Sequence, residues 1–243
     1  MREKIKNLKL VREYKKLKET IKPMTFKEKI QHIFYCYKPE MYVTALITFV
    51  FVFFISCIIT ANTELVIAGD LMNLSISDEG LAYLTDDYVE RLGGKQFLKK
   101  FSIEEIYFTM EEDSDSLEYN YQSVSQTVSR MVAGMLDFQI LSKGGLELFI
   151  GEGFYMDLRK FMTEEELAQW EGKIVYIEYE GSTERIPVAL DISDTAFAKD
   201  CMPYFGPYFF TVVYTTPRLE QCRDFFDYLL AWEENKAAVQ PAA

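Results

Sequence analysis

Residues 41–61 read MYVTALITFVFVFFISCIITA, a stretch of 21 residues without a charged side chain, proline or glycine. As an α-helix this stretch is about 32 Å long, close to the roughly 30 Å hydrocarbon core of a bilayer. Its hydroxyl groups can bond back to the preceding helical turn. A core helix of a soluble protein rarely runs this long with apolar residues on every face. The stretch therefore predicts a transmembrane helix over residues 41–61.

The charges on the two sides of this stretch differ in sign. Residues 1–38 carry 12 Lys or Arg and 4 Glu, whereas residues 62–243 carry 14 Lys or Arg and 33 Asp or Glu. Because cytoplasmic flanks are the Lys- and Arg-rich ones, we expect a single-pass protein with its N-terminus in the cytoplasm and its C-terminal domain outside. The net charge of -12 disfavours nucleic acid as a partner, since phosphate backbones attract clustered Lys and Arg.

Two kinds of processing are alternatives for the same stretch. A cleaved signal peptide fits poorly, because 40 residues precede the apolar run and no Ala-x-Ala site follows it. Phe54-Ile55-Ser56-Cys57 resembles a lipobox, although the usual leucine is missing and the apolar run continues beyond the cysteine. Lipidation of Cys57 stays open.

Residues 1–40 form a basic arm before the apolar stretch. Apolar residues recur there every three or four positions with Lys and Arg between them, namely at Ile5, Leu8, Val11, Tyr14, Leu17 and Ile21. Pro23 interrupts this pattern, and Thr25 with Glu28 resembles a capping box for a second helix. We expect basic helices that contact anionic lipid headgroups. A cytoplasmic partner helix, or a solvated arm that only sets topology, are the alternatives.

Beyond the apolar stretch, strand-like and helix-like segments alternate, which is typical of an α/β domain. We expect this extracytoplasmic domain over residues 62–235, followed by a disordered tail at 236–243. The predicted strands are 64–69, 103–110, 137–141, 174–179, 185–190 and 208–214. The predicted helices begin at Ser77 or Asp78, at 121, after Gly144-Gly145, at Thr163 and at Pro217. The acidic run at 111–116 is expected to be a solvated loop rather than a calcium site.

Several segments carry a resemblance to a known family. Four segments are similar to segments of extracellular solute-binding proteins. They are RMVAGMLDFQI at 130–140, LFIGEGFYMDL at 148–158, RIPVAL at 185–190 and the strand and helix at 209–230. DISDT at 191–195 resembles a segment of single-pass membrane proteins of Gram-positive anaerobic bacteria. The resemblance implies a single three-layer-like α/β lobe of the periplasmic-binding-protein-like fold, because two lobes need about twice the 182 residues present here.

The sequence offers few catalytic groups outside the membrane. The only histidine, His32, lies in the basic arm, so the outer domain has no His-based triad and no His-ligated zinc. We expect no cofactor, no metal and no catalytic residue. Cys201 and Cys222 could form a disulfide; buried free thiols are the alternative, which we favour.

Four residues are candidates for ligand binding. Asp191 and Asp194 follow a predicted strand, where an α/β domain presents functional groups, and Tyr204 and Tyr208 could line a groove beside them. The alternatives are that Asp194 caps a helix starting at Thr195 and that the aromatic residues pack in the core.

We therefore expect a membrane-anchored extracytoplasmic binding or interaction module, with the lipid bilayer and a protein at the cell surface as partners. The alternatives are a carboxylate-dependent cell-wall glycan hydrolase and a subunit of a larger membrane assembly. Convergent acids about 5–10 Å apart in a deep groove would favour the hydrolase. An exposed strand edge would favour the interaction module.

Overall fold

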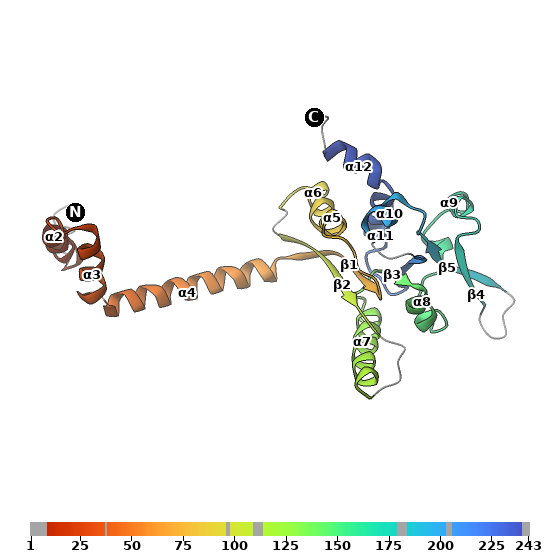
Figure 1. Cartoon of the computed structure of the whole chain (residues 1–243), viewed down its shortest axis with the longest axis horizontal. Coiled ribbons are helices and arrows are strands. Elements are labelled where there is room, and N and C mark those ends of the chain that lie inside the picture. Colours follow the sequence, from red (N-terminus) through yellow and green to blue (C-terminus); the bar gives the residue numbers. More distant parts are fainter. Residues whose placement is uncertain are drawn as a thin grey trace. The chain divides into compact units, whose positions relative to one another are not determined.

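A computed structural model describes residues 9–36, 38–95, 98–108, 114–178, 184–202 and 206–239. The chain divides into two compact units, Met1–Asn62 and Thr63–Ala243. Figure 1 shows the helices and strands of each unit.

The first unit is helical. It comprises α2 (Lys9–Ile21), α3 (Phe26–Cys36) and α4 (Lys38–Ala61). The backbone N–H and the hydroxyl of Thr25 both donate to Glu28 Oε2 at 2.8 Å, which is the side-chain contact expected at the start of α3. Within α4, Met41–Ala61 is long and apolar enough to cross a membrane, and none of its most apolar part is buried within the protein.

The second unit is built on one mixed sheet, which confirms the α/β class. Its strands are β1 (Glu64–Met72), β2 (Lys99–Ile106), β3 (Phe138–Ser142), β4 (Ile174–Glu178), β5 (Arg185–Asp191) and β6 (Tyr208–Val212). The order is β2-β1-β3-β6-β5-β4, with β2, β1 and β3 parallel and the other neighbours antiparallel. The predicted hairpin is present as the antiparallel pair β4 and β5.

Helices lie between the strands and after the last one. The β1–β2 connection contains α5 (Asp78–Ala82), the π-helix η1 (Tyr83–Asp87) and α6 (Tyr88–Arg91), and α7 (Ser114–Val132) joins β2 to β3. After β3 come α8 (Lys143–Phe149), the 3₁₀ turn η3 (Leu158–Lys160) and α9 (Glu164–Gln169). The chain continues with α10 (Ala196–Cys201), α11 (Leu219–Leu230) and α12 (Trp232–Val239). Ser77 caps α5, and Thr163 forms a capping box with Glu166 at α9.

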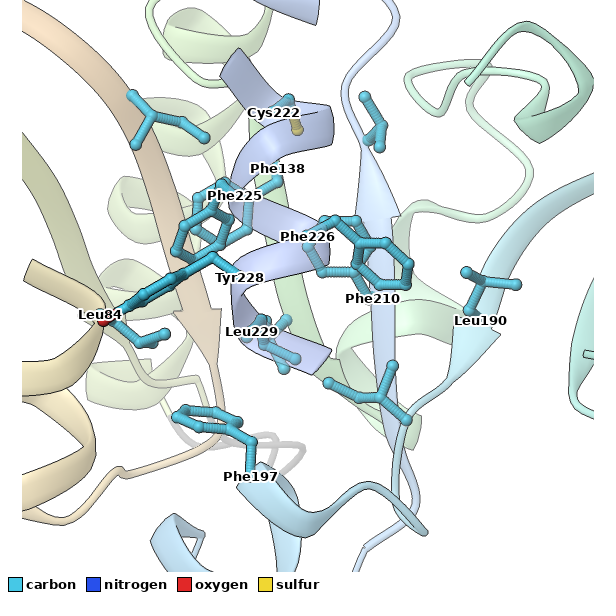
Figure 2. Packing of buried hydrophobic residues seen from close by; sticks show 14 of the residues in the cluster. Leu84, Phe138, Leu190, Phe197, Phe210, Cys222, Phe225, Phe226, Tyr228 and Leu229 are labelled. Carbon is cyan, nitrogen blue, oxygen red and sulfur yellow. The ribbon is translucent and has the colours of Figure 1, made fainter. Parts of the chain in front are cut away.

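Two apolar clusters pack against the sheet. In the first, α11 lies over the central strands, and Figure 2 shows Phe225 and Phe226 beside Phe138 and Phe210. The rings of Phe138 and Phe225, and those of Phe210 and Phe226, have centroids 4.6 Å apart. Alternate strand residues, such as Leu141, belong to a second cluster that includes α8. Packing on both faces explains why β1 is buried almost throughout.

The predicted starts of β2 and α7 are wrong. The strand expected at 103–110 is β2 at Lys99–Ile106, because Phe101 already packs in the core and Lys99 Nζ donates to Gly93 O at 2.8 Å. The helix expected from 121 begins at Ser114, inside the run that we expected to be a loop; residues 109–113 lie outside the described residues.

The tail expected to be disordered from residue 236 is helical as far as Val239. Trp232 is buried and its Nε1–H donates to Asp200 at 2.8 Å, and Asn235 Nδ2 donates to the Tyr83 hydroxyl at 2.7 Å. These contacts hold α12 on the domain, so the helix ends later than the polar and alanine-rich sequence indicates. Residues 240–243 lie outside the described residues.

Candidate functional site

The carboxyl ends of β1, β3 and β5 meet at one edge of the sheet, together with the start of β6. β2 lies on one side of β1 and β3 lies on the other. The connections that leave β1 and β2 therefore run in opposite directions across the sheet, and the strand order reverses between β1 and β3. Open α/β sheets bind ligands outside the carboxyl ends of the strands at such a reversal. This edge is therefore the candidate functional site.

Asp191 and Tyr208, two of the predicted site residues, are brought together here. Asp191 Oδ1 accepts hydrogen bonds from the backbone N–H and the hydroxyl of Ser193, at 3.0 and 2.5 Å. The Ser193 hydroxyl oxygen accepts the Tyr208 N–H at 2.8 Å. The contacts join the end of β5 to the start of β6. Ser193 was not among the predicted site residues, although Asp-x-Ser spacing is typical of a turn closed by the aspartate side chain.

Asp194 lies on the exposed turn after β5, where Lys173 Nζ contacts its Oδ2 at 2.9 Å. The hydrogen bond from Lys173, with the charge of that ammonium group, lowers the pKa of Asp194. The alternative that Asp194 caps the next helix is wrong: the Thr195 hydroxyl accepts the Ala198 N–H at 3.2 Å and caps α10. Tyr204 lies outside the described residues.

Tyr208 faces the core rather than a groove. Its side chain is buried in the first apolar cluster, and burial raises the pKa of its hydroxyl. Phe209 and Phe210 are buried as well. The aromatic segment therefore serves mainly as core, which was the alternative to a ligand-binding groove.

Polar side chains also shape the edge at β1 and β3. Asn73, with a positive φ of 52°, follows β1; its Oδ1 accepts the Phe108 N–H at 2.8 Å. Ser142 caps α8 by accepting the Gly145 N–H at 3.2 Å. A Cβ on Gly145 would come within 3.2 Å of Met72 Cβ, so α8 starts directly against the end of β1. Asn73 and Ser142 were not among the predicted site residues; the signal was a small polar residue at the carboxyl end of each apolar strand.

A second set of polar residues lies inside the sheet. Asp70, Gln139 and Thr211 stand opposite one another on β1, β3 and β6, and all three are fully buried. Arg130 Nη1 of α7 contacts Asp70 Oδ1 at 2.7 Å and Glu104 Oε2 at 3.0 Å. Burial nevertheless raises the pKa of Asp70 to about 7, against the lowering effect of Arg130.

Cys201 and Cys222 are both free thiols in the structure, which is the alternative that we favoured over a disulfide. Both are buried. Burial raises the pKa of Cys201 to about 11, so its thiolate, the reactive form, is scarce near neutral pH.

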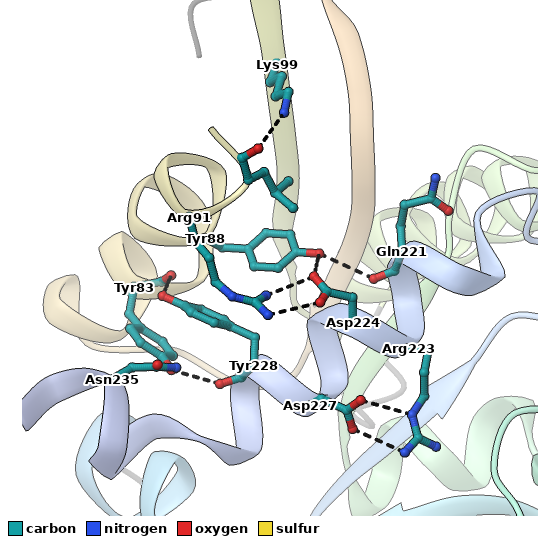
Figure 3. A network of polar contacts seen from close by, with 11 residues as sticks. Tyr83, Tyr88, Arg91, Lys99, Gln221, Arg223, Asp224, Asp227, Tyr228 and Asn235 are labelled. Atoms are coloured by element: carbon teal, nitrogen blue, oxygen red, sulfur yellow. Dashed lines mark hydrogen bonds and ion pairs between the residues drawn. The ribbon is translucent and has the colours of Figure 1, made fainter. Parts of the chain in front are cut away.

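Figure 3 shows a polar network between α6 and α11, to which Asp224 is central. Arg91 donates to both Asp224 oxygens, at 2.9 and 3.1 Å, and the Tyr88 hydroxyl donates to Oδ2 at 3.0 Å. The Tyr83 hydroxyl donates to Tyr228 O at 2.8 Å. Because these groups bond to one another, the network holds the helices together.

The described residues contain open grooves that bear on the hydrolase alternative. One groove of about 400 Å³ lies between α6 and β2, with Asp86, Glu90, Lys99 and Lys100 in its lining. Its two acids are four residues apart on one helical segment, so they line the same wall, whereas a glycosidase needs carboxylates on both sides of the scissile bond. A groove of about 420 Å³ runs beside the edge strand β4 at Tyr176. Among the described residues, no group of three or more His, Cys, Asp or Glu could hold a metal ion.

Comparison with protein-family models, with curated proteins and with solved structures finds no match to this chain.

Proposed function

We propose that this chain is a single-pass membrane protein whose C-terminal domain is an extracytoplasmic binding or interaction module. The observation that carries this proposal is α4. The large apolar side chains from Tyr42 to Ile59 that face outward are 40–69% exposed, and a separately packed unit follows this helix. Water would surround this apolar surface at a high cost in free energy, whereas lipid accommodates it.

The charge distribution supports a cytoplasmic N-terminus. The α2 and α3 segments contribute Lys and Arg on the N-terminal side of α4, and the acidic unit follows on the other side. The same basic side chains supply a surface for anionic lipid headgroups, with exposed Lys15, Lys16 and Lys18 on α2.

Binding rather than catalysis is supported by the carboxyl edge of the sheet. It gathers hydroxyl, amide and carboxylate groups around Asn73, Ser142, Asp191 and Asp194, but no histidine. The groups match a polar ligand: a solute, as the resemblance to one lobe of solute-binding proteins implies, or the polar surface of a protein at the cell surface.

The topology is tested by cysteine labelling in intact cells. In chains whose Cys36 and Cys57 are serine, Glu152→Cys and Lys18→Cys each introduce one exposed thiol. A membrane-impermeant maleimide should label Glu152→Cys in intact cells and Lys18→Cys only after lysis. The reverse pattern, or equal labelling of both, would contradict the proposed orientation.

The binding edge is tested by site-specific photocrosslinking in the same cells. A photoreactive residue at Asp194, on the carboxyl edge, should give a discrete adduct. The matched control is Glu152, an exposed residue shortly before Tyr155, which bridges to Val213 beyond the opposite end of β6. Equal adducts at both positions, or none at Asp194, would argue against this edge as the binding surface.

A further inference from the structure

Strand β2 forms one edge of the sheet. In the part of the chain that the structure describes, β2 pairs only with β1. An edge strand directs alternate backbone N–H and C=O groups outward, where they can pair with another strand. Grooves of about 400 and 250 Å³ border β2, the first on the α6 side and the second on the α7 side.

The charges of β2 are separated along the strand. It reads Lys-Lys-Phe-Ser-Ile-Glu-Glu-Ile, with both lysines before Ser102 and both glutamates after it. If a second copy of β2 lies antiparallel with Ser102 opposite Ser102, Lys100 faces Glu104 and Lys99 faces Glu105. Directly opposite side chains of opposite charge stabilise an antiparallel pair, and like charges destabilise it.

The faces of the strand are consistent with this alignment. Phe101 and Ile103 pack on the first apolar cluster, so Lys100, Ser102 and Glu104 point to the other face. Lys100 and Glu104 are both exposed and would meet on that same face across the two strands. Glu104 keeps its contact with Arg130 at 3.0 Å and still has a side chain 46% exposed.

The pair of Lys99 and Glu105, farther from Ser102, contributes less to the attraction between the two strands. Lys99 Nζ already donates to Gly93 O at 2.8 Å and to Leu92 O at 3.3 Å. Glu105 Oε2 accepts the Tyr107 hydroxyl at 2.7 Å. The specificity of the alignment therefore depends mainly on Lys100 and Glu104.

We propose that two copies of this chain associate through β2, antiparallel and with a two-fold axis at Ser102, so that their sheets become continuous. Edge charges commonly prevent strand pairing, but here the two-fold operation places each lysine opposite a glutamate. An extended segment of another protein is the competing occupant, and it would not require self-complementary charges.

Charge reversal tests the alignment with the full chain purified in detergent. Lys100→Glu should weaken the dimer about tenfold or more, because two attractive pairs become repulsive, and Glu104→Lys should do the same. An equal mixture of the two variants should regain the parent's dimer affinity, since both pairs then join opposite charges. A monomeric parent, or variants that dimerise as tightly as the parent, would overturn the proposal. So would a mixture without rescue when both variants have the parent's circular dichroism spectrum.

A disulfide at the axis gives an independent readout. Opposite residues of antiparallel strands have Cα atoms about 4.5–5.5 Å apart, within reach of a disulfide. In chains whose Cys36 and Cys57 are serine, Ser102→Cys should form a linked dimer on mild oxidation, and adding Lys100→Glu should suppress it. Ser125→Cys, exposed on α7, is the matched control and should not link. Equal linking of both positions, or none at Ser102→Cys, would mean that copies do not meet through β2.

Discussion

Asp70 and Gln139 lie directly opposite each other on β1 and β3, and both are fully buried. Asp70 Oδ2 and Gln139 Oε1 each lack a hydrogen-bond partner among the described residues. Both atoms are acceptors when Asp70 is ionised, so neither can bond to the other. A buried acceptor without a donor disfavours the ionised form of Asp70, which fits the pKa of about 7 that burial gives this group.

The first prediction concerns the pH dependence of stability. The pKa of Asp70 is about 7 in the fold and 3.8 in its unperturbed state, so the folded chain binds the proton more tightly. The contribution of Asp70 to stability is present below pH 4 and is lost as the pH rises to 7, by about 1.4 kcal/mol per pH unit at most. We expect Asp70→Asn to abolish this part of the decline between pH 5 and 7, as measured by urea unfolding.

The control for this prediction is Glu147→Gln, which removes an exposed carboxylate from α8. The control should keep the parent's slope of unfolding free energy against pH. If the Asp70→Asn variant shows that same slope, Asp70 is ionised throughout the range and its pairing with Arg130 outweighs burial.

The second prediction concerns the other buried aspartate. Asp137 Oδ2 accepts the Ala68 N–H at 2.7 Å and Arg218 Nε at 2.9 Å, and Oδ1 accepts the Thr216 hydroxyl. Arg218→Met removes the charge partner of a fully buried carboxylate and should cost about 3–5 kcal/mol of unfolding free energy. Arg185→Met, at an exposed pair with Glu178, should cost less than about 1 kcal/mol. Equal losses of unfolding free energy in the two variants would show that the buried pair of Asp137 and Arg218 stabilises the fold no more than an exposed pair does.

Local patterns in the sequence predicted most elements of the fold. The run of acids directly after Thr163 marks the start of α9, and the apolar segments at 174–179 and 185–190 mark β4 and β5. Ends that depend on distant partners were predicted less well. The predicted first strand stops at residue 69, but β1 continues through Asp70, whose buried side chain contacts Arg130, sixty residues later.

The candidate site was predictable only in part, for the same reason. Asp191 was recognisable as a polar residue at the end of an apolar strand. Its contact through Ser193 with Tyr208 depends on β5 and β6 being neighbours, which the sequence order alone does not reveal. Tyr208, expected in a groove, is buried because β6 lies in the interior of the sheet with packing on both faces.

The third prediction concerns the cysteines. The chain has four, and Cys201 and Cys222 are buried free thiols. Denaturation without a reductant should therefore expose four titratable thiols per chain. Two thiols, rising to four after reduction, would indicate a disulfide. Three thiols with or without reductant would indicate that one cysteine is modified, for which Cys57 is the candidate.

The fourth prediction tests the packing between β1 and β3. Gly69 stands opposite Phe138, and a Cβ added to Gly69 would lie 2.1 Å from the ring. Gly69→Ala must displace this fully buried ring and should cost about 1–3 kcal/mol of unfolding free energy, or more. Gly151→Ala is the matched control, because nothing lies within 4 Å of an added Cβ there, and its effect should stay within about 0.5 kcal/mol.

The double variant shows whether the ring is the cause. Phe138→Leu removes the atoms that an alanine at position 69 would meet, although it costs stability itself. If the clash is real, combining the two substitutions should cost at least about 0.5 kcal/mol less than the sum of the single losses. Strictly additive losses would mean that position 69 tolerates a methyl group and that β1 and β3 are packed less closely than the register indicates.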